Sequence, residues 1–280
     1  MRNPYLVGEI GINHNSDMNI AKALIRQAQE TGWDAVKFQK RTIDAVYTPE
    51  FLASPRESPW GTTQRAQKEA LEFSIEQMGE LFDYARSLGL EPFASAWDFG
   101  SLIEVEDLNP KYHKVASPFL TNKDFLYEVA NLGKKTFIST GASTMRDIGL
   151  AVDLFRRYCC PFTLLHCVSV YPCQEELTNV GMVKTLREVF KCDVGYSGHE
   201  VGILPSILAA ALGASVIERH ICISRADYGS DQSASLERRG MELLAKYCRG
   251  IPAAMSDGVK RILPGEAESA RKLRYWADVA

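Results

Sequence analysis

The fold is decided by two short runs of sequence, Asp193-Val194-Gly195-Tyr196-Ser197-Gly198-His199 and Ser215-Val216-Ile217-Glu218-Arg219-His220. Each run is mostly apolar and as short as a buried strand, and residues 204–212 between them have the apolar spacing of a helix. A strand, a helix and a second strand in this order indicate a parallel βαβ unit. Parallel strands end at the same edge of a sheet, so the histidines that close both runs are expected to be neighbours.

The same alternation of short apolar runs and helical stretches extends along the chain. Eight runs predict strands, at 5–11, 35–40, 92–97, 112–117, 136–140, 162–168, 193–197 and 215–220. Helices are expected at 19–31, 75–88, 98–108, 124–132, 145–158, 181–190, 204–212 and 236–255. Eight such units in 280 residues favour an α/β fold, a single (β/α)8 TIM barrel. An open doubly wound sheet is the rival, but it usually has a Gly-rich turn after its first strand, and residues 11–15 read Gly-Ile-Asn-His-Asn.

We expect residues 1–280 to form one TIM-barrel catalytic domain. The connection over 41–73 is long and polar and contains prolines, Pro55 and Pro59 among them, which is typical of a loop that covers an active site. The segment 258–280 is charged and is expected to be a helical tail, interrupted at Pro264-Gly265.

Composition excludes several classes of partner. The formal net charge of −3 gives no global attraction to nucleic acid or to an anionic membrane. The seven cysteines show no paired spacing, which favours free thiols over a disulfide framework. No signal peptide and no membrane-spanning run is recognisable, so a cytoplasmic location is expected.

The histidine pair, His199 and His220, suggests a metal site. The residues end consecutive strands, and neighbouring strands lie about 4.8 Å apart. Two imidazoles at this spacing can share one ion, with water or substrate oxygens as further ligands. Imidazole with oxygen ligands suits Mn, Co, Fe or Zn better than Mg. The alternative is two polar core histidines bonded to backbone; Glu218 could orient a ligand or pair with a buried cation.

Two lysines, Lys37 and Lys114, lie inside apolar strands, where lysine is rarely placed without a partner. Together with the hydroxyls of Ser95, Ser117, Ser139 and Ser197 they predict a site for a phosphate or a carboxylate. A Schiff-base lysine and a structural salt bridge to Glu9 or Glu218 remain alternatives. Glu9 itself could act as an acid or a base, or could pair with a lysine.

Two further residues near strand ends are ambiguous. His14 follows the first strand and could contact substrate or simply be solvated at the surface. Cys167 and His166 are adjacent, so they face opposite sides of a strand and cannot form a nucleophile–base pair. We therefore interpret Cys167 as a small residue of the barrel interior.

Eight strings of sequence, in register from residue 5 to about 262, resemble the sialic acid synthase family. They are Glu9-Ile10-Gly11-Ile12-Asn13-His14-Asn15, Val36-Lys37-Phe38-Gln39, Lys114-Val115-Ala116-Ser117, Ser139-Thr140-Gly141, residues 165–172 (Leu-His-Cys-Val-Ser-Val-Tyr-Pro), Gly195-Tyr196-Ser197-Gly198-His199, Ile217-Glu218-Arg219-His220 and Gly229-Ser230-Asp231.

This resemblance implies a barrel enzyme that joins phosphoenolpyruvate to N-acetylmannosamine or a related aldose and releases phosphate. The positions matching the phosphoenolpyruvate site are Lys37, Ser95, Lys114, Ser117, Ser139, Ser169, Tyr171 and Ser197. Gln39 and Asp231 would face the sugar, and Glu9 would match the family's acidic residue near the reacting carbons. The resemblance further implies a divalent metal on His199 and His220, Mn²⁺ first with Co²⁺ or Mg²⁺ as alternatives, and a homodimer.

The sequence departs from the family's pattern in two places. Family members usually carry a C-terminal antifreeze-like domain, and this sequence stops near the point where the linker to that domain would begin, so a short form is expected. The family's Ser-Gly-Glu after the fourth strand is here Ser117-Pro118-Phe119, which leaves the identity of the aldose open. A metal-dependent aldolase or isomerase and a non-catalytic sugar-binding barrel are the rival functions.

Overall fold

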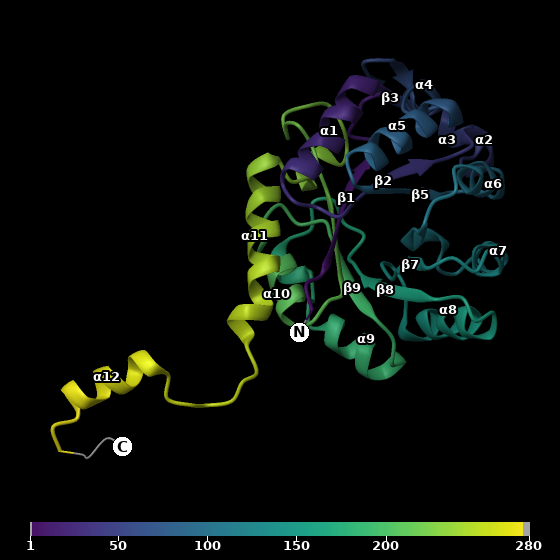
Figure 1. Cartoon of the computed structure of the whole chain (residues 1–280). Coiled ribbons are helices and arrows are strands. Elements are labelled where there is room, and N and C mark those ends of the chain that lie inside the picture. The colour runs from purple at the N-terminus through teal and green to yellow at the C-terminus, as the bar shows by residue number, and fades with distance from the viewer. Residues whose placement is uncertain (1, 277–280) are drawn as a thin grey trace.

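The structure, a computed structural model, describes residues 2–276 and contains a closed barrel of eight parallel strands (Figure 1). The strands are β1 Tyr5–Gly11, β2 Ala35–Lys40, β5 Glu91–Ala96, β6 His113–Val115, β7 Thr136–Ser139, β8 Phe162–His166, β9 Val194–Gly198 and β10 Val216–His220. They follow one another around the barrel in chain order, and β10 closes the ring by pairing with β1. The predicted (β/α)8 barrel is therefore confirmed.

A helix follows each barrel strand and covers it from outside, as predicted from the 3.6-residue spacing. These helices are α1 Met18–Glu30, α5 Ile75–Ser87, α6 Phe99–Asp107, α7 Lys123–Asn131, α8 Met145–Arg157, α9 Met182–Phe190, α10 Leu204–Ala211 and α11 Arg238–Met255. Several begin where a side chain accepts a hydrogen bond from a free backbone N–H, namely at Asp17, Ser74, Asp98, Asn122 and Thr144.

Two predicted strands were too long. The strand predicted at 112–117 ends at Val115, because Ser117–Phe119 form a 3-10 turn and Pro118 has no N–H to donate to a neighbouring strand. The run 162–168 was wrong because the ladder of β8 stops at His166. The backbone beyond these two strands therefore turns out of the sheet, and its side chains become available to the barrel mouth.

The barrel interior has two chemically different layers. The layer at the amino ends of the strands is apolar and consists of Val7, Ala35, Phe93, Phe137, Leu165 and Val216, with Tyr5 and Tyr112 packed against it. Two residues further along the same strands the inward positions are polar and equally buried, as at Lys37 and Glu218. Because side chains two apart share a face, this change sets the site at the carboxyl ends of the strands.

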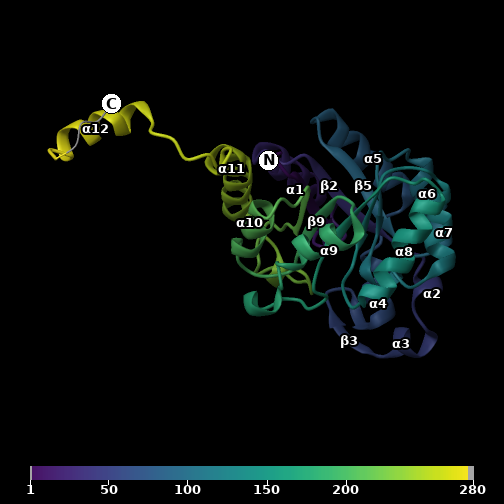
Figure 2. The ribbon, with the colours of Figure 1, turned by 90° about the horizontal axis from the view of Figure 1, so that it is seen from below.

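The segment 41–73 is not an irregular loop. It contains α2 Ile43–Val46, α3 Pro49–Ala53, the hairpin of β3 Pro55–Ser58 and β4 Gly61–Thr63, and α4 Gln64–Ala70. Figure 1 shows them near α5 and α6, whereas Figure 2 shows α2, α3, α4 and β3 gathered at one edge of the molecule, away from α5. Each element is too short to carry a periodic signal, so the sequence did not predict them.

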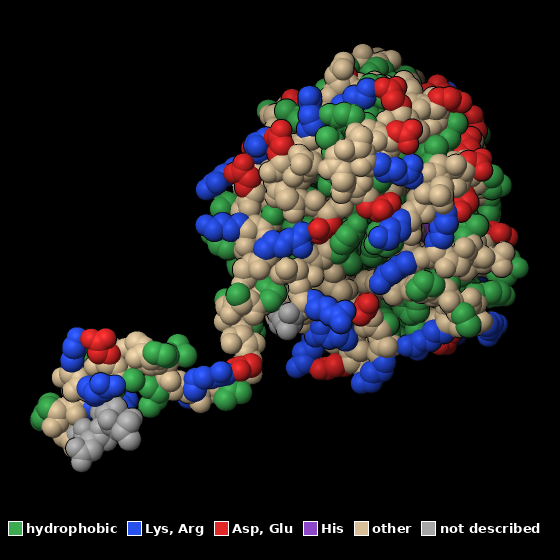
Figure 3. Space-filling model, viewed as in Figure 1, with side chains coloured by type: hydrophobic (Ala, Val, Ile, Leu, Met, Phe, Trp, Pro, Cys, Tyr) green, Lys and Arg blue, Asp and Glu red, His purple; other side chains and the backbone are tan. Residues whose placement is uncertain are grey.

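The C-terminal segment leaves the barrel after α11. Helix α12, Pro264–Leu273, stands away from the barrel in both views (Figures 1 and 2), and Leu273 at its end and Tyr275 and Trp276 after it are exposed. Residues 277–280 of the predicted tail lie outside the described residues. Over the face seen in Figure 3, Lys and Arg are interspersed with Asp and Glu. Within residues 2–276 no helix has both the length and the apolar character needed to cross a bilayer.

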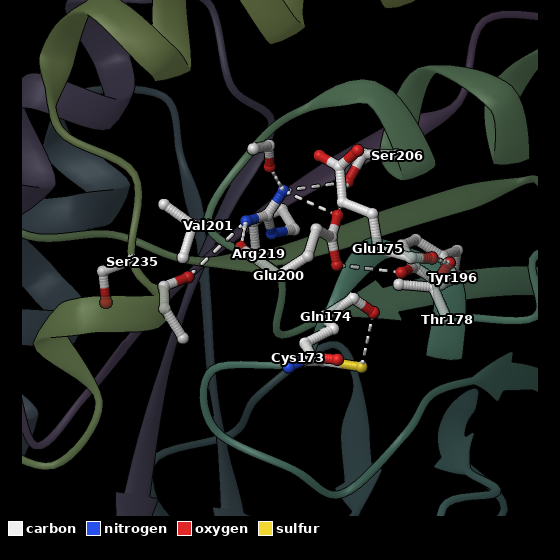
Figure 4. A network of polar contacts seen from close by, with 12 residues as sticks. Cys173, Gln174, Glu175, Thr178, Tyr196, Glu200, Val201, Ser206, Arg219 and Ser235 are labelled. Atoms are coloured by element: carbon white, nitrogen blue, oxygen red, sulfur yellow. Dashed lines mark hydrogen bonds and ion pairs between the residues drawn. The ribbon is translucent and has the colours of Figure 1, made fainter.

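A fully buried ion pair, Arg219 with Glu200, fastens β10 to the turn that follows β9 (Figure 4). Arg219 Nη1 donates to Glu200 Oε1 at 2.9 Å and to the backbone oxygen of Gly202 at 2.8 Å. The hydroxyls of Tyr196 and Ser206 donate to the two oxygens of the same carboxylate, at 2.8 and 3.0 Å. Glu200 directly follows His199, so this network fixes the backbone on which that imidazole sits.

We expect Arg219→Met or Glu200→Gln to lower the free energy of unfolding by about 3–5 kcal/mol, since either change leaves one buried charge without its partner. Urea denaturation of both variants measures this loss. The double variant is the control, because it removes both charges and should cost clearly less than the sum of the single changes. Additive losses would show that the two charges are not coupled.

Candidate active site

One cavity of about 180 Å³ lies inside the carboxyl ends of the barrel strands. Its walls contain every predicted site residue except Asp231: Glu9, Lys37, Gln39, Ser95, Lys114, Ser117, Ser139, Ser169, Tyr171, Ser197, His199 and His220. Glu218, Trp97, Cys167, Ala116 and Pro118 complete the lining. All eight barrel strands or the turns that follow them contribute, so the cavity exists only once the barrel has closed.

The floor of the cavity is a chain of four buried charges. Lys37 Nζ lies 2.9 Å from Glu9 Oε2 and 3.6 Å from Glu218 Oε1. Lys114 Nζ lies 2.9 and 3.0 Å from the two oxygens of Glu218. Both lysines therefore form salt bridges with Glu9 or Glu218, as one alternative predicted, and these salt bridges lie in the wall of the cavity. Glu218 was not among the predicted site residues, although its place beside His220 on a strand pointed to it.

Burial and ion pairing shift the pKa values of the two lysines in opposite directions. Burial lowers the pKa of Lys37, but the charges of Glu218 and Glu9 outweigh it, and the pKa is raised above its usual value. Burial, together with the charge of Lys37, lowers the pKa of Lys114, although Glu218 opposes this. Burial raises the pKa of Glu218, but both ammonium groups outweigh burial and hold it below its usual range. A Schiff base on Lys37 is disfavoured, because it needs a neutral amine.

The lysines retain the capacity to bind a further anion. An ammonium group carries three donors, and the carboxylates leave both lysines at the wall of the cavity. Hydroxyls surround them: Ser197 donates to Glu218 at 3.0 Å, and the hydroxyls of Ser117 and Ser169 lie 3.0 Å apart. A Cβ at Gly141 would collide with the Ser169 hydroxyl, so the absence of a side chain there lets the two turns meet.

The two histidines face each other at the rim, with ring centroids 5.7 Å apart. Nδ1 of His199 donates to the backbone oxygen of Val168 at 2.7 Å, so its Nε2 is an acceptor, and the hydroxyl of Tyr171 lies 2.9 Å from it. Burial, with the charge of His220 adding to it, lowers the pKa of His199 to about 3. The imidazole of His199 is therefore neutral and offers a lone pair, as a metal ligand must.

His220 has a different environment. Its Nδ1 is buried, has no hydrogen-bond partner among the described residues and lies 3.8 Å from Asp231 Oδ2. Asp231 thus reaches the rim from the loop after β10, although it does not line the cavity itself. Across residues 2–276 no three His, Cys, Asp or Glu side chains are grouped closely enough to hold a metal alone. An ion on the two imidazoles would therefore need oxygen ligands from water or substrate.

The structure also shows the contacts of Gln39, Cys167 and His166. Gln39 donates to Glu9 Oε1 at 2.8 Å, so the amide and the carboxylate form one polar wall. Cys167 faces the cavity and accepts from the N–H of Gly141 at 3.1 Å, whereas His166 points away and contacts the backbone of Thr178. Trp97 was missed as a lining residue, although its two-residue spacing from Ser95 indicated the same face.

His14 is not solvated at the surface, which was one of the two alternatives for it. It is buried at 3% exposure, lies outside the cavity and stacks on Phe73 with ring centroids 4.0 Å apart. Burial, with the charge of Arg41 adding to it, lowers its pKa to about 3. The surface alternative for His14 was wrong because Phe73, at the end of the segment 41–73, covers it.

Comparison with known proteins decides the family. The sequence profile of the NeuB family matches residues 24–260. The chain belongs to the NeuB family. The NeuB-family relatives include N-acetylneuraminate-9-phosphate synthase of Mus musculus, 36% identical, with 96% of this chain and 76% of that protein covered. N,N'-diacetyllegionaminic acid synthase of Campylobacter jejuni is 32% identical, with 98% and 84% covered.

A solved structure in the NeuB family agrees with the sequence relatives. The N-acetylneuraminic acid (sialic acid) synthetase of Leptospira borgpetersenii superposes with a TM-score of 0.85 at 26% identity, covering 98% of this chain and 93% of that one. The resemblance found from the eight strings of sequence is therefore confirmed. This NeuB chain is an enzyme, a synthase of the sialic acid type.

We expect Glu218→Gln to lower the free energy of unfolding by about 3–5 kcal/mol in anion-free buffer, because two buried ammonium groups then share Glu9 alone. Added inorganic phosphate should restore part of this loss and stabilise the variant more than the wild type, since it supplies the missing negative charge. Denaturation curves with and without phosphate measure both effects. Glu188→Gln, at an exposed pair with Lys184, is the control and should change little. An equal phosphate response in Glu218→Gln and wild type would contradict the anion site.

We expect the buried His14 to lower the free energy of unfolding as the solution becomes acidic. Its pKa is lowered in the folded chain, so below about pH 6.5 the unfolded chain binds a proton that the folded chain does not. Between about pH 6 and 4 this residue alone should remove about 1.4 kcal/mol of stability per pH unit. His14→Phe, which keeps the stack on Phe73, should have a shallower pH dependence in urea denaturation. Parallel curves for the variant and the wild type would rule out a neutral buried His14.

Proposed function

We propose that this synthase condenses phosphoenolpyruvate with N-acetylmannosamine or a related aldose, giving a 2-keto-3-deoxy sugar acid and inorganic phosphate. One observation carries the proposal: two buried ammonium groups and two imidazoles line the same cavity of about 180 Å³. The imidazole of His199 is neutral, and Nδ1 of His220 has no hydrogen-bond partner among the described residues. The ammonium groups suit an anionic donor, and the imidazoles lie at the rim, where an aldehyde would enter. The names of the relatives support the same reaction class.

Lys37 and Lys114 would hold the carboxylate and the phosphate of phosphoenolpyruvate, aided by Ser95, Ser117, Ser139, Ser169 and Ser197. Held in this way, the enol carbon attacks the aldehyde carbon and forms the new C–C bond. Water then adds to the carbon that bears the phosphate ester, and the resulting hemiketal phosphate expels phosphate by C–O cleavage. The chain contributes position and a fixed positive field to the anionic groups throughout these steps.

Glu9 is suited to the water-addition step. It is 1% exposed, faces the cavity and is held by Gln39 and Lys37, so its carboxylate has a fixed direction. We propose that it orients the attacking water or accepts the water's proton. Tyr171, Gln39 and Asp231 would then bound the space for the aldose.

His199 and His220 would hold a divalent ion, Mn²⁺ first and Co²⁺ or Mg²⁺ as alternatives. The neutral Nε2 of His199 and the orphaned Nδ1 of His220 fit such an ion, as does the nearby carboxylate of Asp231. When bound, the ion would polarise the aldehyde oxygen as a Lewis acid. The protein's own part is to fix the tautomer of His199 through Val168.

We further propose a cytoplasmic homodimer. The cysteines at the seven positions are all free thiols in the structure, which fits a reducing compartment. The homodimer rests on the family resemblance.

A panel of aldoses tests the function. After chelation and return of Mn²⁺, the enzyme should release phosphate from phosphoenolpyruvate only when an accepted aldose is present. Lys114→Met should lower kcat/KM by at least about 100-fold, because it removes one of the two ammonium groups that would bind phosphoenolpyruvate. Lys135→Met, at an exposed pair with Asp193, is the matched control and should keep full activity. Turnover of an aldose without phosphoenolpyruvate would instead indicate an aldolase or isomerase, and binding without turnover a non-catalytic barrel.

A further inference from the structure

The turn of residues 12–16, directly after β1, contains part of a sequence string that the proposed chemistry leaves unused, Asn13-His14-Asn15. Asn13 is 2% exposed and is not one of the residues that line the cavity. The chain enters the turn beside the rim, since a Cβ at Gly11 would lie 3.5 Å from Cε1 of His220. A buried amide at this place can act on the site only through its neighbours.

Both hydrogens of the Asn13 side-chain amide are used on the loop that follows β10. Nδ2 donates to the backbone oxygen of Ile221 at 2.9 Å and to the hydroxyl oxygen of Ser235 at 2.8 Å. Ile221 directly follows His220, and Ser235 is fully buried near the other end of the loop. The amide of Asn13 therefore ties together the two ends of the loop 221–236.

The hydroxyl of Ser235 connects Asn13 to Asp231. It donates its single hydrogen to the backbone oxygen of Asp231 at 2.7 Å, so towards Asn13 it can only accept. Oδ2 of Asp231 in turn lies 3.8 Å from Nδ1 of His220. Asn13, Ser235 and Asp231 thus form a chain of hydrogen bonds of fixed direction that ends at the rim of the cavity.

A second amide of the same turn holds the middle of the loop. Asn15 Nδ2 donates to the backbone oxygen of Tyr228 at 2.8 Å. Asn15 and Ser16 have φ angles of 48° and 65°, in the left-handed region that is uncommon for residues other than glycine. Unfavourable backbone conformations of this kind concentrate at functional sites. The turn therefore keeps a costly conformation in which two amides, those of Asn13 and Asn15, hold one loop.

We propose that Asn13 is a positioning residue for the acceptor side of the synthase reaction, acting through Ser235 on the loop that carries Asp231. This inference rests on the proposed function, in which Asp231 and His220 face the divalent ion and the aldose. Without the Asn13 donors, the oxygen of Ile221 and the hydroxyl of Ser235 lose a buried partner. The loop then no longer holds Asp231 in one place, whereas the two lysines of the cavity floor, on other strands, keep their positions.

The first experiment compares backbone hydrogen exchange in the wild type, Asn13→Leu and Gln27→Met. Gln27 is the matched control, a buried amide whose Nε2 donates to the backbone oxygen of Cys222, in the same loop, at 3.1 Å. Relative to the amides of α8, we expect those of 231–235 to exchange about 10- to 100-fold faster in Asn13→Leu, because two buried hydrogen bonds are lost. Gln27→Met should keep the wild-type rates. Unchanged exchange in Asn13→Leu would overturn the proposal.

The second experiment separates positioning from a loss of folded enzyme. With phosphoenolpyruvate, Mn²⁺ and the aldose accepted in the panel, kcat/KM for the aldose should fall about 10- to 100-fold in Asn13→Leu through a higher KM for the aldose. KM for phosphoenolpyruvate should stay unchanged. Ser235→Ala is a smaller change and should reproduce this pattern. The double variant should be no worse than Asn13→Leu, because both residues act through one chain of hydrogen bonds.

Each other outcome has a definite meaning. A fall in kcat with both KM values unchanged would show that Asn13 only maintains folded enzyme, and additive losses in the double variant would show that Ser235 is not the link; either result would overturn the positioning role. If no aldose is turned over with phosphoenolpyruvate, the proposed function is contradicted, and calorimetry with Mn²⁺ alone decides the role of Asn13. Binding of Mn²⁺ weakened about 10-fold in Asn13→Leu but not in Gln27→Met would support that role. Equal or absent binding in all three proteins would overturn it.

Discussion

The burial of Glu218 between Lys37 and Lys114 is the constraint on which the rest of the structure depends. An isolated charge inside a barrel is costly, so each of these groups requires the others. They come from β10, β2 and β6, three strands that are distant in sequence and not all adjacent in the barrel. The charges can be satisfied together only when the ring of strands is complete. The polar layer therefore couples closure of the barrel to formation of the cavity.

The strand β10 is used on both of its faces. Glu218 and His220 point into the cavity, and Arg219 between them points outward into the network with Glu200. That network holds the turn of His199, and the carbonyl of Val168 then fixes the orientation of its imidazole. The floor of the cavity and its rim are thus positioned by neighbouring residues of one strand. A displacement of β10 would disturb the anion site and the histidine pair at the same time.

The proposed sugar side of the site is built differently from the proposed donor side. The residues proposed to bind the donor lie on strands and on the turns directly after them. The segment 41–73 and the loop after β10, which we propose bound the sugar side, are joined through the hydroxyl of Tyr228, which contacts Gln67 and the backbone of Glu57. Such connections can change without altering the barrel, and relatives named for different sugar acids match this chain over 96% and 98% of its length. The division allows one reaction to be kept while the acceptor varies.

The sequence by itself determined the barrel, because eight short apolar runs alternating with helix-period stretches have few other ways to bury both faces of a sheet. The two-residue alternation in each strand also placed Lys37, Lys114, His199 and His220 at one end of it. Only the tertiary structure decided which charges pair, since the partners of Glu218 lie more than a hundred residues away and several carboxylates were available. It also decided that Phe73 covers His14. These are contacts between segments whose approach is set by packing, and no local pattern of residues encodes them.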